Sequence, residues 1–161
     1  AGLKVACPFN GSSTSMPPFQ SYHIHILFWP DGEKADGFGG PNAHDRAGAT
    51  RLRNAFIEHF GLTGVANCTG LHKQAGMCPY KEDTAPGYGF SHPFLVPNFD
   101  FYIPISRFAD TIPWIMQHRG AYDVLVHPNS GCLINDHLHW SLWGGNKWEL
   151  RMPTEQHQAV V

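Results

Sequence analysis

Tyr22-His23-Ile24-His25-Ile26-Leu27-Phe28 is the stretch that decides the fold. Every second residue, beginning with His23 and His25, would lie on one side of an extended chain, and the residues between them are aromatic or branched. A β-strand places alternate side chains on opposite faces of its sheet, whereas a helix repeats every 3.6 residues. We therefore predict a strand over residues 22–28 with an apolar face and a face that carries two histidines.

The remaining elements follow from the same test of periodicity. Apolar residues three and four positions apart predict helices over residues 45–60 and 106–119. Ser106 is the expected N-cap of the second helix, but Pro113 lies inside this span and would also allow the regular helix to begin near Thr111. Apolar extended runs predict further strands over residues 65–72, 99–103 and 122–127, and a last one over residues 137–143.

Up to residue 127 this element order is βαββαβ, which is the order of the ferredoxin-like fold. In that topology the strands are all antiparallel, the first strand lies between the third and the fourth, and two helices cover one face of the sheet. The other face is left for a site or a subunit partner. We expect an α+β domain with extended loops over residues 21–150, an N-terminal arm over residues 1–20 and a C-terminal tail over residues 151–161.

The composition fits one globular domain. The chain has 161 residues, of which 42% are hydrophobic and 15% charged, and its formal net charge is -2 at pH 7. This length and apolar content supply one core, and the charge excludes a strongly basic nucleic-acid binder. No run of about 18 apolar residues is present, which excludes a membrane span. Eleven histidines, as many as all lysines and arginines together, point instead to metal binding or proton transfer.

Four cysteines predict two disulfide bonds. They form no C-x-x-C pair of the kind found in zinc ribbons or redox motifs. Of the three pairings that four cysteines allow, we choose Cys68–Cys78, which would close the insert after the second strand, and Cys7–Cys132, which would tie the N-terminal arm to the turn after residue 127. Both bridges would hold segments that have little core of their own. The alternative is four reduced thiols in a cytosolic protein.

Two N-x-S/T sequons, at Asn10 and Asn67, are open to glycosylation in a secretory pathway. Together with the cysteines they favour an oxidising compartment, so we expect a secreted protein. The sequence begins without the charged and apolar regions of a signal peptide, and we expect any such peptide to have been removed.

The histidines of the first strand are the leading candidates for metal ligands. His23 and His25 lie on one face of that strand, about 7 Å apart along the backbone, and can converge on one ion. If the strand over residues 122–127 runs antiparallel beside it, His127 comes near His23. Three imidazoles would hold an iron or zinc ion and leave coordination positions open for catalysis. The alternative is an H-x-H pair that merely lies on the solvent face of a strand.

The other histidines differ in rank. His92 shortly precedes the strand that begins at residue 99, and His137 and His139 share one cluster, so these three are further candidates. We expect solvent-exposed positions, on helix faces or in the tail, for His44, His59, His118 and His157. His72 fits either group.

Several of these segments resemble the DOPA 4,5-dioxygenase family of fungi and bacteria. The most specific is the octapeptide Val124-Leu125-Val126-His127-Pro128-Asn129-Ser130-Gly131. The others are Tyr22-His23-Ile24-His25, Asp136-His137 followed by Leu142-Trp143, Ser91-His92-Pro93 and Ile112-Pro113-Trp114-Ile115-Met116. The resemblance implies a small ferredoxin-like protein, commonly a homodimer. It also implies extradiol cleavage of the catechol ring of DOPA by dioxygen, with non-haem Fe(II).

Five histidines match the pattern of the family, namely His23, His25, His92, His127 and His137. The pair on the first strand and His127 are the expected metal ligands. If the site needs two histidines and one carboxylate, Asp123 and Asp136 are the nearest acidic residues. Either His92 or His137 is the expected base for the catechol protons. Zinc or another divalent metal could take the place of iron.

Two features set this chain apart within the family. The segments 29–43 and 73–90 are longer than expected, and the cysteines and sequons suggest a secreted branch. Pigment biosynthesis is normally intracellular, so catechols derived from plants or lignin are more plausible substrates than DOPA itself. His139 falls outside the family pattern and drops in rank.

Two other classes of function stay open at this point. One is a non-catalytic secreted protein that binds a metal or phenols through the same histidines. The other is a hydrolytic zinc enzyme, which the absence of an H-E-x-x-H motif disfavours. Metal analysis combined with oxygen uptake on a panel of catechols would separate the three classes.

Overall fold

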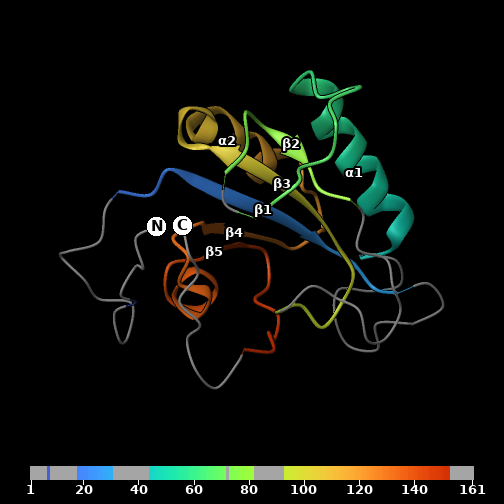
Figure 1. The fold of residues 1–161 in the computed structure, drawn as a ribbon. Helices are drawn as coiled ribbons and strands as arrows, with labels where there is room; N and C mark the ends of the chain where they lie inside the picture. Colours follow the sequence, from blue (N-terminus) through green and yellow to red (C-terminus); the bar gives the residue numbers. More distant parts are fainter. Residues whose placement is uncertain (1–6, 8–17, 31–43, 72, 82–92, 153–161) are drawn as a thin grey trace.

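The structure, a computed structural model, describes residues 7, 18–30, 44–71, 73–81 and 93–152 (Figure 1). Its strands are β1 (Ser21–Leu27), β2 (Cys78–Pro79), β3 (Asn98–Pro104), β4 (Val124–Pro128) and β5 (Leu142–Gly144). Its helices are α1 (Arg46–His59) and α2 (Phe108–His118). A short 3-10 turn, η2 (Ile105–Arg107), precedes α2, and a π-helical turn, η3 (Asn135–His139), precedes β5.

The strands form one antiparallel sheet in the order β2-β3-β1-β4-β5. β1 lies in the centre, where Ile24 faces Phe101 of β3 on one side and Val126 of β4 on the other. This arrangement confirms the predicted ferredoxin-like topology, with β5 added at the edge beside β4. The predicted N-terminal arm and C-terminal tail lie largely outside the described residues.

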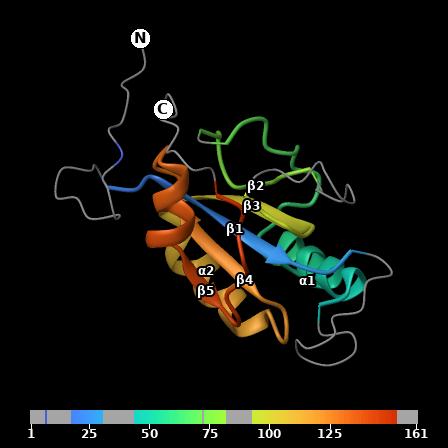
Figure 2. The same ribbon diagram turned by 90° about the horizontal axis from the view of Figure 1, so that it is seen from below.

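Both long helices pack on one face of the sheet, and η3 lies on the opposite side (Figures 1 and 2). The helix-covered face is apolar because Ile24 and Ile26 of β1 alternate with the histidines. Phe56 of α1 stacks on Phe101 of β3, with ring centroids 4.2 Å apart, and both side chains are fully buried. Full burial of one such side chain contributes about 1.5–3 kcal/mol, so this face holds the main core.

The start of α1 is fixed by a contact with the segment before β4. Asp45 caps the helix by accepting a hydrogen bond from the backbone amide of Gly48 at 3.3 Å, and the Tyr122 hydroxyl donates to the same carboxylate at 2.5 Å. A Cβ atom at Gly48 would overlap the Tyr122 hydroxyl oxygen. Position 48 is therefore glycine because the tyrosine ring passes directly over the helix backbone.

The face of the sheet that carries the histidines is only partly open. At its far end, Leu27 and Leu125 form a second apolar cluster with Phe94 and Val96. Three tryptophans, Trp29, Trp143 and Trp148, pack against this cluster. The histidine-bearing part of the face is thus left between this cluster and the turn that follows β4.

Three local predictions were wrong. Residues 65–71 form no strand, because Val65 and Leu71 are exposed and give that segment no buried face. The second strand is instead Cys78–Pro79. The first half of the predicted strand over residues 137–143 is the π-helical turn η3, and only its end joins β5. Ser106 lies in η2 and caps nothing, while α2 begins at Phe108 with Pro113 inside it.

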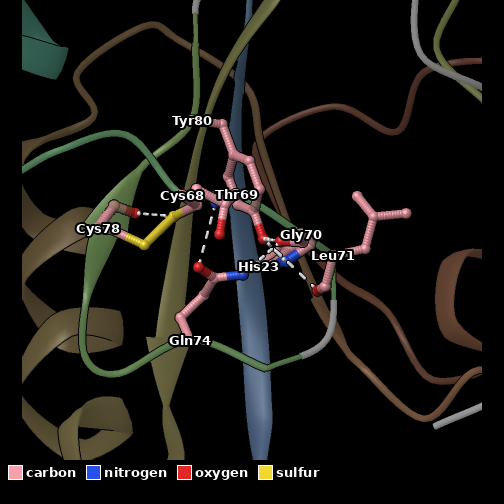
Figure 3. The surroundings of a disulfide bond; sticks show 8 residues. All are labelled: His23, Cys68, Thr69, Gly70, Leu71, Gln74, Cys78 and Tyr80. Carbon is pink, nitrogen blue, oxygen red and sulfur yellow. Dashed lines mark hydrogen bonds between the residues drawn. A yellow bond between two sulfur atoms is a disulfide. The ribbon is translucent and has the colours of Figure 1, made fainter.

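Both predicted disulfide bonds are present. Cys7–Cys132 ties the N-terminal segment to the turn before η3, and Cys68–Cys78 closes the loop that leads into β2 (Figure 3). Such cross-links stabilise a fold chiefly by restricting the unfolded chain, which suits segments with few core contacts. None of the described helices has the length and apolar character that crossing a bilayer requires.

Candidate metal centre

Three histidines from the two central strands meet on the face of the sheet opposite the long helices. His23 and His127 are direct cross-strand partners, and His25 follows two positions along β1. All three side chains are buried, and each offers a ring nitrogen within 4.8 Å of those of the other two. The alternation of β1 and the antiparallel pairing of β4 therefore bring together the predicted ligand set.

The rings of His25 and His127 are oriented by hydrogen bonds at their δ nitrogens. The Nδ1 atom of His25 lies 2.9 Å from Oδ1 of Asn98, and Nδ1 of His127 lies 2.8 Å from the backbone carbonyl oxygen of Pro128. Since both oxygens accept, each Nδ1 carries the proton and each Nε2 carries a lone pair. Partners of this kind are the usual means by which proteins orient metal-binding histidines.

The two lone pairs point at each other. Nε2 of His25 lies 3.1 Å from Nε2 of His127, a separation at which two unprotonated nitrogens repel. Unprotonated imidazole nitrogens are the donors that divalent ions such as zinc and iron take in proteins. The donor set therefore fits a divalent metal bound between them.

Both rings are held in the neutral form that a metal requires. Burial lowers the pKa of His25 well below its ordinary value, and the neighbouring His23 and His137 lower it further. Burial also lowers the pKa of His127, with the same effect from His137, His23 and His25. Because a metal binds the deprotonated imidazole, these pKa shifts keep the site ready for an ion at neutral pH.

His23 has a different neighbour, Tyr80, which follows β2. The Tyr80 hydroxyl lies 2.9 Å from Nε2 of His23 and donates to the backbone carbonyl oxygen of Gly70 at 2.7 Å (Figure 3). Burial raises the pKa of Tyr80, and the charge of Asp100 raises it further, so the hydroxyl keeps its proton at neutral pH.

His137 lies beside the three histidines on η3. Its ring centroid is 3.9 Å from that of His127 and 6.4 Å from that of His25. Its Nδ1 donates to the carbonyl oxygen of Leu133 at 2.9 Å, which leaves the lone pair on Nε2. Burial lowers the pKa of His137 to about 4, against a smaller opposing effect of the Leu133 hydrogen bond. His137 is thus a neutral base next to the candidate metal centre.

The two acidic residues considered as ligands are engaged elsewhere. Asp123 accepts hydrogen bonds from Nε2 of His44 at 2.8 Å and from Nε1 of Trp148 at 2.6 Å. Asp136 accepts from the hydroxyl and the backbone amide of Ser130, and burial raises the pKa of Asp136 to about 7. Within the part of the chain that the structure describes, the cluster of ligand atoms contains three histidines and no carboxylate.

The remaining histidines divide as follows. His59, His118 and His139 are exposed, as expected for the first two. The prediction that His44 is solvated was wrong, because its side chain is only 2% exposed and is paired with Asp123. The predicted base His92 lies outside the described residues, as do His72 and His157. Of the two sequons, Asn67 is exposed and Asn10 lies outside the described residues.

Two residues of the site were missed in the sequence. Asn98 is the first residue of β3, one position before the predicted start of that strand, so its place on the histidine face went unnoticed. Asn98, Asp100 and Tyr102 are alternate residues of β3, and this alternation is the signal that could have placed Asn98 on the histidine face. For Tyr80 the sequence holds no comparable signal, because its position depends on the loop closed by Cys68–Cys78.

Comparison with known proteins agrees with this architecture. A crystal structure from Nostoc punctiforme, described as a "putative dioxygenase", superposes with a TM-score of 0.55 at 23% sequence identity, covering 82% of this chain and 87% of that one. At this identity the likeness shows a shared fold. No curated protein matches the chain significantly. The profile of the Dopa 4,5-dioxygenase family matches residues 22–154, which is most of the chain, and the chain belongs to that family.

Proposed function

We propose that the protein is a non-haem dioxygenase that opens the ring of catechols at the extradiol position, with Fe(II) held by His23, His25 and His127. The observation that carries this proposal is that the Nε2 atoms of His25 and His127 face each other 3.1 Å apart in a buried position. Family membership supports dioxygenase chemistry, and the description of the Nostoc punctiforme protein as a "putative dioxygenase" agrees with it.

The bound metal would supply Lewis acidity and open coordination positions for the two catechol oxygens and for dioxygen. Three neutral imidazoles add no negative charge to a divalent ion. Anionic catechol oxygens would therefore be more strongly favoured here than in a site with a carboxylate ligand. Asn98 and the Pro128 carbonyl keep the ligand rings oriented through the reaction by their hydrogen bonds to the δ nitrogens.

His137 is the residue we assign to proton transfer. Its Nδ1 proton is held by the Leu133 carbonyl, so Nε2 is the atom that takes a catechol proton and later returns it. A pKa of about 4 keeps Nε2 unprotonated throughout the physiological range, so its lone pair faces the site without a proton. His92 remains a second predicted base.

An aromatic wall beside the ligands suits a ring-shaped substrate. The Phe94 ring lies 4.4 Å from the His25 ring and 5.9 Å from the His137 ring, measured between centroids. Aromatic rings pack favourably at such distances. We propose catechols derived from plants or lignin as the substrate class, with DOPA as the reference compound for the family.

The two disulfides support secretion, because such bonds persist in oxidising compartments. We therefore propose an extracellular protein that meets its catechols outside the cell. The exposed position of Asn67 is compatible with glycosylation there. We propose a homodimer only because members of the family are commonly homodimers.

The decisive experiment measures oxygen uptake by the iron-loaded protein with a panel of catechols and matched monophenols. Ring opening consumes one dioxygen per catechol, places both oxygen atoms in the product and breaks the bond between a hydroxylated carbon and its unhydroxylated neighbour. A yellow semialdehyde should form from catechols and nothing from monophenols, which cannot chelate the metal through two oxygens. Catechol binding without oxygen uptake for any compound would identify a binding protein instead.

A further inference from the structure

The loop closed by Cys68–Cys78 brings two residues together at the edge of the metal centre (Figure 3). In addition to the disulfide, a backbone hydrogen bond joins the two segments, in which the amide of Cys68 donates to the carbonyl oxygen of Pro79 at 2.9 Å. Gly70 and Tyr80 each lie two residues beyond a bridged cysteine, and the Tyr80 hydroxyl meets the Gly70 carbonyl oxygen at 2.7 Å. The disulfide and the backbone hydrogen bond beside it thus join the two chain segments that carry these groups.

The Gly70 carbonyl is itself held in place from within the loop. The Gln74 side chain donates from Nε2 to this carbonyl oxygen at 2.6 Å and accepts at Oε1 from the backbone amide of Thr69 at 3.2 Å. Figure 3 shows Gln74 bridging the loop in this way. With Tyr80 and Gln74 as donors, both lone pairs of the Gly70 oxygen are used.

The neighbours of the Tyr80 hydroxyl decide the direction of its hydrogen bonds. Two are backbone carbonyl oxygens, of Gly70 at 2.7 Å and of Leu71 at 3.5 Å, and the third is Nε2 of His23 at 2.9 Å. A phenol has one proton, and carbonyl oxygens only accept. Were this proton directed to His23, two oxygen atoms would face each other at 2.7 Å without a proton between them. Tyr80 therefore donates to Gly70 and accepts from Nε2–H of His23.

A neutral imidazole has one N–H proton, so a proton fixed on Nε2 places the lone pair on Nδ1. We propose that Tyr80, held by the Cys68–Cys78 loop, is a positioning residue that fixes His23 as an Nδ1 ligand, whereas His25 and His127 bind through Nε2. This inference rests on the proposed metal site. It makes the disulfide loop an outer support of the metal centre.

Partners of this kind change metal affinity by about 10–100-fold when they are removed. We expect Tyr80→Phe to weaken Zn(II) binding, measured by chelator competition on the full chain, by a factor in that range. Tyr102→Phe is the matched control, since the Tyr102 ring also lies against His23, at 6.1 Å between centroids, while its hydroxyl makes no hydrogen bond in the described part of the chain. We expect its zinc affinity to stay within about twofold of the wild type.

Imidazole ¹⁵N NMR of the metal-free wild type reports the tautomer of His23. This tautomer would not depend on Tyr80 if Tyr80 had only a structural role. We expect the His23 signals of the Nε2–H tautomer, and a mixture of tautomers in Tyr80→Phe. The opposite tautomer in the wild type would overturn the proposal even if the variant failed to fold. So would wild-type zinc affinity in a folded Tyr80→Phe. If the wild type bound no metal at all, the proposed function would be wrong. The NMR measurement would still show which tautomer His23 adopts, so the two proposals are tested separately.

Discussion

Nε2 of His25 and Nε2 of His127 face each other at 3.1 Å from neighbouring strands, each on a ring whose δ nitrogen is already used. Without a cation between them the two lone pairs repel, so the metal-free fold carries an unfavourable contact in a buried position. A bound ion replaces that repulsion with two ligand bonds. Metal binding and the stability of the fold are therefore linked through this pair.

The first prediction concerns this linkage. At a free metal concentration of 100 times the dissociation constant, binding should raise the free energy of unfolding by about 2.7 kcal/mol. His25→Ala should abolish both the stabilisation and stoichiometric metal binding while leaving the sheet intact, because its side chain faces away from the main core. Urea unfolding with and without metal and elemental analysis are the measurements. His59→Ala, on the exposed side of α1, is the control, and full metal content in His25→Ala would contradict the assignment.

The second prediction concerns Asn98, whose side chain is only 1% exposed and whose Oδ1 accepts from Nδ1 of His25. Asn98→Leu removes that acceptor and should weaken metal binding by about 10–100-fold. Asn98→Asp keeps an oxygen in place and should retain most of the affinity. Chelator competition on both variants measures the difference. Equal affinity in the two would show that the ring of His25 is oriented by something else.

The central part of the site could be predicted because two regular patterns act together. The alternation of β1 puts His23 and His25 on one face, and the element order makes β4 its neighbour. The approach of His127 towards His23 followed from these two facts, and the structure shows the two residues directly opposite each other. The disulfides were predictable for a related reason, since each holds a segment with little core.

The parts that could not be predicted depend on contacts between distant residues. His44 is buried through Asp123, 79 residues further along the chain, and Tyr80 meets His23 across 57 residues. Residues 137–143 read as an extended run, yet the start of this segment forms a helical turn in which Asp136 binds Ser130 and His137 binds Leu133. Side-chain hydrogen bonds of this kind leave no periodic trace in a sequence.

The third prediction is that Asp123 stabilises the fold and does not bind the metal. Its buried carboxylate accepts from Nε2 of His44, Nε1 of Trp148 and the backbone amide of Asn146. Asp123→Ala should lower the free energy of unfolding by on the order of 3 kcal/mol, because a buried donor left without an acceptor costs about 1–3 kcal/mol. The metal affinity of the folded variant should be unchanged. Urea unfolding and chelator competition test this, and loss of metal from a folded Asp123→Ala protein would mean that the carboxylate reaches the ion.

The fourth prediction concerns the stability of the metal-free protein in acid. The pKa values of His25, His127 and His137 are lowered in the fold, for His137 to about 4. As the pH falls below about 6.5, these histidines become protonated in the unfolded chain but stay neutral in the folded protein. The free energy of unfolding therefore decreases. Asp136 opposes this, because its raised pKa of about 7 lets the folded state hold a proton that the unfolded chain releases. Three histidines outweigh one carboxyl group.

Urea midpoints between pH 7 and pH 5 measure this effect. His137→Gln should reduce the slope of the free energy of unfolding against pH by up to about 1.4 kcal/mol per pH unit, because it removes one histidine that is protonated only in the unfolded chain. His59→Gln, at an exposed position, is the comparison variant. Metal-free protein that gained stability over this range on acidification would refute the prediction.

The last prediction places His137 in proton transfer rather than in metal binding. Its Nε2 carries the lone pair beside the ligand cluster, with the ring of His127 3.9 Å away between centroids. His137→Gln should lower the turnover number per bound iron by about 10²–10⁴-fold, which is the usual contribution of a general base. Iron content and anaerobic catechol binding should persist, because the three ligand nitrogens stay where they are. His139→Gln is the matched control, two residues further on the same turn and exposed. A His137→Gln protein that lost its iron would instead mark His137 as a fourth ligand.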